Sequence, residues 1–251
     1  RRKSAVMGLL HSFYCWGSVA TIALSTLFFS CFGTENWRIL AILWALLPLV
    51  NALVFTQVPL APLTPEGESG LPLGQLFRTP RFWLFLLLMA CAGASELSIS
   101  QWASAFAESA LGVSKTVGDL AGPLAFALLM GLSRLVYAAY SRTHPSPVGF
   151  MTASTALCIA GYLLVSLSPW PALALAGCAL CGMAVGCMWP GTFSLATACF
   201  PRSGTALFAL LALAGDLGCA GGPALVGLIA GASGGNLKAG LAAAGWIPAV
   251  L

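Results

Sequence analysis

Charged residues are scarce in this chain of 251 residues: 11 Lys and Arg and 7 Asp and Glu make up only 7% of it. Soluble domains carry about 25% charged residues and need them to cover their surface. Hydrophobic residues reach 59% and gather in runs of about twenty residues or more, the length of a membrane-spanning helix. A β-barrel would instead alternate polar and apolar residues over short stretches. The composition therefore predicts an all-α integral membrane protein.

Several common functional motifs are also missing. The sequence has no GxxxxGK[ST] phosphate loop of an ATP-driven motor, no HExxH, no paired-Asp motif and no Ser/His set on facing spans. The net charge of +4 is too small to indicate nucleic acid. The nine cysteines are scattered, and the CxxC of Cys178 and Cys181 lies within an apolar run without a histidine or a second pair, which is typical of packing residues. We expect no enzyme activity, no metal or cofactor and no nucleic-acid partner.

Apolar segments follow one another along the chain with mostly short connections. The one long connection, residues 58–81, is rich in Pro, Gly and Glu and is the only credible domain boundary. The chain has neither an initiator Met nor a signal peptide, and its last segment is near the lower length limit for spanning, so we expect a fragment. The eight segments cover residues 5–32, 37–57, 82–110, 115–140, 147–168, 171–199, 204–231 and 236–251.

The basic residues between these segments are distributed unequally over the two sides of the membrane. By the positive-inside rule, the richer side is cytoplasmic, which places the chain start and the linker in the cytoplasm. The richer side holds Arg1, Arg2, Lys3, Arg78, Arg81, Arg142 and Arg202, and the other holds Arg38, Lys115 and Lys238.

Four stretches make the chain similar to the major facilitator superfamily, and within it to the bacterial fucose-permease-like branch of sugar:proton symporters. "MGLLHSFYCWG" (7–17) resembles the fifth helix of that branch, and "SELSISQWASAFAESALG" (95–112) resembles the start of the second half. "MWPGTFSLATACFPRSGTALF" (188–208) resembles the tenth helix, and "AGDLGCAGGPALVG" (214–227) resembles the eleventh.

This resemblance implies an incomplete major facilitator-type helical bundle that contains the last eight of twelve helices. Residues 1–57 would be the last two helices of the first half, 58–81 the cytoplasmic linker between the halves, and 82–251 the second six-helix half with a truncated last helix. The resemblance also implies a monomer in the bacterial cytoplasmic membrane that moves a small hydrophilic solute, a sugar, by proton-coupled alternating access, with its site at mid-membrane.

A polar stripe on the first segment is a candidate wall of the solute cavity. His11, Tyr14, Ser18, Thr21 and Ser25 fall within an arc of about 80° on a helix, and lipid would leave such groups unpaired. Interhelical hydrogen bonding by Ser and Thr is the alternative.

Further candidates for solute binding are polar or aromatic residues inside apolar runs. An amide suits sugar hydroxyls, and an indole face suits the C–H surface of a sugar ring. A Trp at these positions is alternatively an interfacial anchor or the filler of a helix bend, and the polarity on two faces of 82–110 predicts a helix that unwinds locally. The candidate set is His11, Tyr14, Asn51, Gln101, Trp102 and Trp189.

Glu96 and Asp216 are carboxylates inside apolar runs, and we expect them to couple transport to protons. A charge at the centre of a membrane helix costs about 2.5–3.5 kcal/mol, so it needs a partner, a water-filled cavity or a proton. Hydrogen bonding to a neighbouring helix is the structural alternative for both residues. We expect Arg134 to snorkel to the cytoplasmic end of its span and to serve structure or gating.

Proline and glycine mark two places where helices bend or approach closely. Pro190 lacks a backbone donor, which predicts a kink in the segment 171–199. Gly218, Gly222 and Pro223 form a GxxxGP motif in the segment 204–231, a motif that in the superfamily marks antiporters when it lies in the fifth helix. Two alternatives to a symporter therefore remain, a drug or metabolite:proton antiporter and a sensor or scaffold that binds without transporting.

Overall fold

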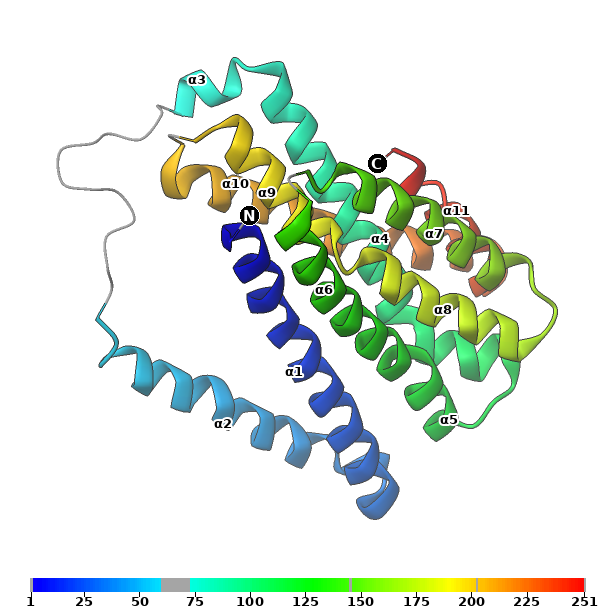
Figure 1. The fold of residues 1–251 in the computed structure, drawn as a ribbon. Coiled ribbons are helices and arrows are strands. Elements are labelled where there is room, and N and C mark those ends of the chain that lie inside the picture. The colour runs from blue at the N-terminus through cyan, green and yellow to red at the C-terminus, as the bar shows by residue number, and fades with distance from the viewer. Residues whose placement is uncertain (1, 60–72, 145, 202, 251) are drawn as a thin grey trace.

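A computed structural model describes residues 2–59, 73–144, 146–201 and 203–250. All regular elements within these ranges are helices, joined by turns and short irregular segments (Figure 1). The elements are α1 (Arg2–Phe32), η1 (Thr34–Asn36), α2 (Trp37–Phe55), α3 (Leu73–Phe77), α4 (Pro80–Leu111), α5 (Lys115–Asp119), η2 (Leu120–Leu124), α6 (Ala125–Thr143), α7 (Val148–Leu167), α8 (Pro171–Val185), α9 (Met188–Cys199), α10 (Gly204–Ala232), α11 (Leu237–Ala244) and η3 (Pro248–Val250).

The described residues contain seven helices that are long and apolar enough to cross a membrane. Their bounds agree with the first seven predicted segments to within three residues. The predicted eighth segment forms a shorter apolar helical stretch, Leu237–Val250. Helices are required here because a bilayer offers no hydrogen-bond partners to an open backbone. Most of the predicted linker, residues 60–72, lies outside the described residues, and α3 occupies part of the remainder.

The longest described helix, α4, is bounded by residues suited to helix ends. Pro80 is its first residue, where a missing amide costs nothing. Gly112 ends it in the left-handed conformation at φ 67°, and Val113 N donates to Ala107 O at 3.2 Å. The 32 residues between form one continuous α-helix. The predicted local unwinding of this segment is therefore wrong.

Two other spans are interrupted near a proline, whereas α2 and α10 contain Pro48 and Pro223 and stay continuous. The span from Pro171 to Cys199 is divided into α8 and α9 by Gly186 and Cys187, which confirms the kink predicted from Pro190. The fourth span contains the π-helical turn η2 around Pro123. Both interruptions follow from the absent amide of proline, which cannot donate to the carbonyl four residues earlier.

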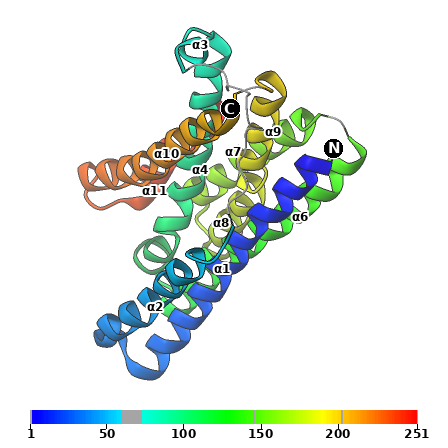
Figure 2. The same cartoon turned by 90° about the vertical axis from the view of Figure 1, so that its left-hand side faces the viewer.

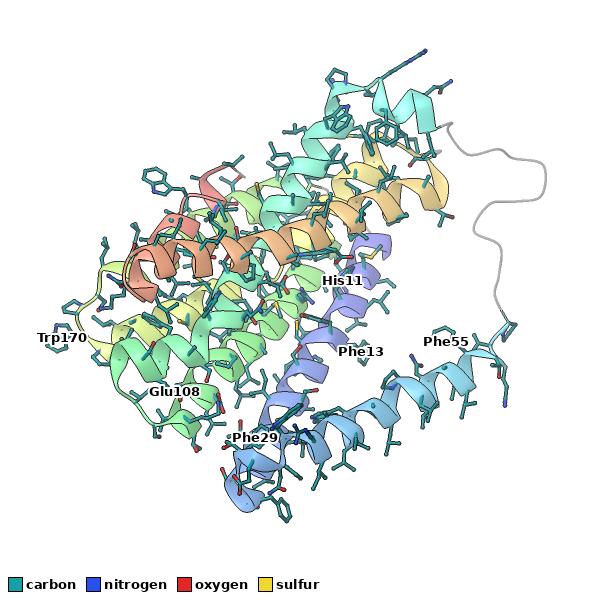
Figure 3. The ribbon with its side chains drawn as sticks, turned by 180° about the vertical axis from the view of Figure 1, so that it is seen from behind. His11, Phe13, Phe29, Phe55, Glu108 and Trp170 are labelled. Carbon is teal, nitrogen blue, oxygen red and sulfur yellow. The ribbon has the colours of Figure 1, made fainter. Side chains whose placement is uncertain are left out.

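The first two helices are packed very differently. α1 lies along α6 in both views (Figures 1 and 2), and Gly8 and Gly131 allow the close approach: an added Cβ would lie 3.3 Å from Ala138 and 3.2 Å from Cys15, respectively. α2 stands apart from the bundle, with Phe55 at the end farther from α1 (Figure 3), and Leu40 is its only buried residue. Trp44 Nε1 ties α2 to α1 by donating to Ser25 Oγ at 3.1 Å.

α4 and α10 form the tightest helix pair in the second part of the chain. Gly218 packs on the backbone of Ala90, and a Cβ on Gly222 would lie 2.6 Å from Ala94 O. In return, a Cβ on Gly93 would overlap the Gly215 carbonyl. Because lipid tails are as apolar as the helices, such close packing of small residues replaces the hydrophobic effect as the force between the spans.

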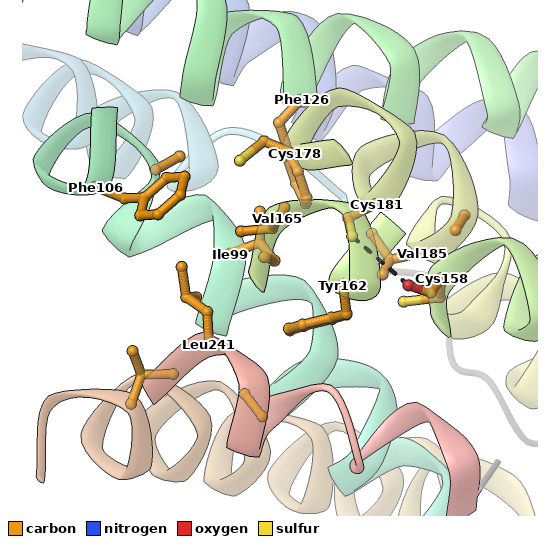
Figure 4. Close-up of a cluster of buried hydrophobic side chains, with 14 of the residues drawn as sticks. Ile99, Phe106, Phe126, Cys158, Tyr162, Val165, Cys178, Cys181, Val185 and Leu241 are labelled. Carbon is orange, nitrogen blue, oxygen red and sulfur yellow. Dashed lines mark hydrogen bonds between the residues drawn. The ribbon is translucent and has the colours of Figure 1, made fainter. Parts of the chain in front are cut away.

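The main core lies where α4, α6, α7, α8 and α11 meet (Figure 4). Tyr162 is buried there and donates from its hydroxyl to Ser95 O at 2.9 Å. Cys178 and Cys181 are fully buried, and the thiol of Cys181 contacts Cys158 O at 3.8 Å. The CxxC pair is thus part of the packing, as its apolar context predicts.

Candidate functional site

Glu96 and Arg134 form a buried ion pair between α4 and α6. The exposed fractions of the Arg134 and Glu96 side chains are 3% and 6%, and Arg134 Nη2 lies 3.7 Å from Glu96 Oε2. That separation is too long for a hydrogen bond, and Oε2 has no hydrogen-bond partner among the described residues. The two charges therefore attract each other without a direct hydrogen bond between them.

The remaining donors of Arg134 hold backbone carbonyls of two other segments. Nη1 donates to His11 O of α1 at 2.6 Å, and Nε donates to Gly186 O, between α8 and α9, at 3.0 Å. The predicted snorkelling of Arg134 to the membrane end is wrong, because these carbonyls and Glu96 hold the guanidinium inside the bundle, where the residue is only 2% exposed.

The α1 side of this site presents two of the predicted solute-binding residues. The Arg134 guanidinium carbon lies 5.5 Å from the centre of the Tyr14 ring, a cation–π distance. Tyr14 itself is 55% exposed. His11 is half-buried, and its ring centre lies 5.9 Å from that of Phe193 on α9. The ion pair thus has the aromatic ring of Tyr14 and the backbone of His11 on its α1 side.

Further along α1 the polar stripe serves other contacts. Ser18 Oγ donates to Tyr14 O at 3.0 Å within the helix, and Ser25 accepts the hydrogen bond from Trp44. Only the first part of the stripe therefore lies at the Glu96–Arg134 pair, and Ser25 fits the alternative of interhelical bonding.

Trp189 lies beside this site on α9. Its ring covers Gly215 of α10 so closely that a Cβ there would overlap it, and its centre is 6.3 Å from that of Phe193. The Nε1 donor of Trp189 is buried and has no partner among the described residues. The indole ring therefore packs against α10, and stacking on a solute and filling of the bend both stay predictions for Trp189.

Trp102 and Gln101 occupy a different region, further along α4. Trp102 Nε1 donates to Pro223 O of α10 at 3.0 Å. Its ring borders an open groove of about 510 Å³ that Glu108, Gly227 and Leu237 also line. Gln101 is exposed. In Figure 3, Glu108 lies away from His11, near the end of α4. The two tryptophans predicted to bind solute, Trp102 and Trp189, therefore do not share one pocket.

Asn51 and Asp216 are both exposed. Asn51 lies on α2, apart from the bundle, and Asp216 lies on α10 next to the buried Gly215. No hydrogen bond or ion pair within the described part of the chain involves Asp216. Gly218, Gly222 and Pro223, by contrast, are buried against α4.

A second polar cluster joins α4 to α5, and the sequence interpretation missed it. Lys115 Nζ lies 3.2 Å from Asp119 and 3.6 Å from Glu108, and Ser104 Oγ donates to Asp119. The i, i+4 spacing of Lys115 and Asp119 was the available signal. Gly186 was missed as well, although it lies four residues before Pro190. Among the described residues, no group of three His, Cys, Asp or Glu side chains is placed to hold a metal ion.

Comparison with protein-family models matched residues 1–250 to the model of the Major Facilitator Superfamily. No curated protein and no solved structure matched the chain.

Proposed function

This chain belongs to the Major Facilitator Superfamily of membrane transporters, and we propose that it moves a small hydrophilic solute, a sugar, by proton-coupled alternating access. The observation that carries the proposal is the Glu96–Arg134 pair, an ion pair with 3% and 6% exposed side chains inside an apolar multi-helix protein. Ionisable groups in membrane spans are rare because they are expensive, and they commonly mark ion and substrate pathways.

The geometry of the pair suits a carboxylate that exchanges a proton. The guanidinium at 3.7 Å offsets the charge of an ionised Glu96 without a hydrogen bond that would have to break first. When Glu96 takes a proton, Arg134 keeps its hydrogen bonds to His11 O and Gly186 O. The protonated carboxyl gains a donor, and the Arg134 guanidinium then faces a neutral partner. Each protonation state thus offers a different set of hydrogen bonds to a solute.

The surroundings of the pair favour a solute rich in hydroxyl groups. Tyr14 presents an exposed ring beside Arg134, His11 lies one turn before it, and Trp189 carries an unpartnered indole donor. Aromatic faces suit the C–H surface of a sugar ring, and the donors suit its hydroxyls. Gln101, Trp102 and Asn51 stay predicted solute-binding residues, and Asp216 stays a predicted proton-coupling residue.

The proposal includes the architecture predicted from the sequence. Residues 1–57 belong to the first half of a twelve-helix transporter, residues 58–81 connect the halves in the cytoplasm, and residues 82–251 belong to the second half of a monomer in a bacterial cytoplasmic membrane. The packing of α1 on α6 supports this, because it joins the two parts at the Glu96–Arg134 pair.

The test is uptake of labelled sugars by the full-length protein in vesicles, with and without a pH gradient. We expect Glu96→Gln to abolish accumulation driven by the gradient while exchange at equal concentrations partly survives, since Gln keeps the shape of Glu but fixes a neutral state. Glu35→Gln changes an exposed carboxylate in η1 and serves as the matched control. Unchanged gradient-driven uptake by a normally expressed Glu96→Gln variant would refute proton coupling at Glu96, and exchange of none of the sugars would refute the substrate class.

A further inference from the structure

The carbonyl that holds Arg134 Nε is free because of a proline. In a helix each amide donates to the carbonyl four residues earlier, so the residue that would bond Gly186 O is Pro190, which has no N–H. The next amide, Gly191 N, donates normally to Cys187 O at 2.8 Å. The interruption between α8 and α9 therefore leaves the Gly186 carbonyl to another donor, and Arg134 Nε takes it at 3.0 Å.

Gly186 also has to be a glycine for this contact to exist. A Cβ at this position would lie 2.8 Å from Met130 O and 2.8 Å from Ser133 Cβ, both on the turn of α6 that precedes Arg134. A Met130 carbonyl cannot retreat as a flexible side chain does, so any larger residue would push the interruption away from α6. The buried guanidinium would then lose its acceptor, and an unsatisfied buried charge is costly.

We propose that Pro190 and Gly186 are positioning residues for the proton-coupling pair, acting through Arg134. Pro190 frees a carbonyl, Gly186 brings that carbonyl against α6, and the two fix the guanidinium with one nitrogen toward Glu96 and another on His11 O of α1. The α8–α9 interruption thus bends the span and also supplies the backbone acceptor for Arg134, and we call this acceptor, Gly186 O, the seat of Arg134. The assignment of the pair to proton coupling rests on the proposed function, whereas the seat itself rests on the geometry alone.

The seat is tested by the thermal stability of the full-length protein in detergent. Pro190→Ala supplies an amide that competes with Arg134 for Gly186 O. We expect Pro190→Ala to lower the unfolding temperature in the wild-type background. It should have little further effect in Arg134→Gln, because that variant has no guanidinium that could lose its hydrogen bond to Gly186 O. Pro48→Ala, which changes the in-helix proline of α2, is the matched control and should have equal effects in both backgrounds. Pro190→Ser supplies the same amide should Pro190→Ala fail to express.

If Pro190 only shapes the helix, Pro190→Ala lowers the unfolding temperature equally with and without Arg134. That result would overturn the proposal. In transport, we expect Pro190→Ala to reduce gradient-driven accumulation more than exchange at equal concentrations, as in Glu96→Gln. Equal reductions in both would overturn the link to coupling. If Glu96→Gln leaves gradient-driven uptake unchanged, the proposed function fails, yet the stability comparison still decides whether Pro190 seats Arg134.

Discussion

Arg134→Gln tests how much the buried Glu96–Arg134 ion pair contributes to the free energy of unfolding. Removing one partner of a buried pair costs about 3–5 kcal/mol, because the remaining charge is left uncompensated. Glu96 is badly placed to tolerate the loss, since it is only 4% exposed and its Oε2 has no other partner among the described residues. For a chain of this size 1 kcal/mol shifts the unfolding temperature by roughly 2–4 °C. We therefore expect a drop of about 6–20 °C.

The same experiment includes a variant that separates the ion pair from general damage. In Glu96→Gln/Arg134→Gln both charges are gone, so the double variant should be more stable than the sum of the two single losses predicts, by about 0.5–3 kcal/mol. The assay is the surviving monodisperse fraction in size-exclusion chromatography after heating at neutral pH. Arg81→Gln, an exposed residue of α4, should change the free energy of unfolding by no more than about 0.5 kcal/mol. Additive losses, or an Arg134→Gln variant as stable as Arg81→Gln, would refute the reasoning.

Three further predictions follow from the packing and the topology. Gly218→Ala places a Cβ against the backbone of Ala90 and should cost about 1–3 kcal/mol as overpacking, whereas Gly221→Ala, with open space at its Cβ, should be neutral or stabilising; equal unfolding temperatures would contradict the tight α4–α10 pair. Among the described cysteines, Cys31 and Cys199 are exposed, and a membrane-impermeant maleimide should label Cys31 only from outside the cell and Cys199 only from the cytoplasm; the reverse pattern would invert the proposed orientation. The 251-residue chain expressed alone should insert without accumulating solute, and concentrative uptake by it in vesicles would contradict the proposed twelve-helix architecture.

The bounds of the seven long spanning helices could be predicted from the sequence, whereas the predicted eighth span is a shorter helical stretch, Leu237–Val250. Long apolar runs must become helices in a bilayer, because every amide and carbonyl needs a partner within its own segment. Proline likewise acts locally, so the bend before Pro190 followed from one residue type and a fixed hydrogen-bond spacing. The family was suggested by short stretches such as residues 188–208, and the family model matches residues 1–250.

The tertiary structure decided which face of each helix is buried. In helices such as α4, polar and apolar residues are mixed around the axis, so hydropathy does not distinguish the face toward protein from the face toward lipid. Packing depends instead on where small residues let two backbones approach, as Gly93 and Gly218 do between α4 and α10. For the same reason, nothing in the pattern around Asn51 indicated that α2 would stand apart from the bundle.

The partnership of Glu96 and Arg134 also had to come from the structure. Each residue alone reads as a costly charge in an apolar run, and the sequence assigned Arg134 to the membrane end of its helix. Three contacts from separate segments override that preference: the carboxylate of Glu96 on α4, His11 O on α1 and Gly186 O between α8 and α9. A buried guanidinium stays where its charge is offset and its donors are satisfied, and only the folded arrangement brings those groups to one place.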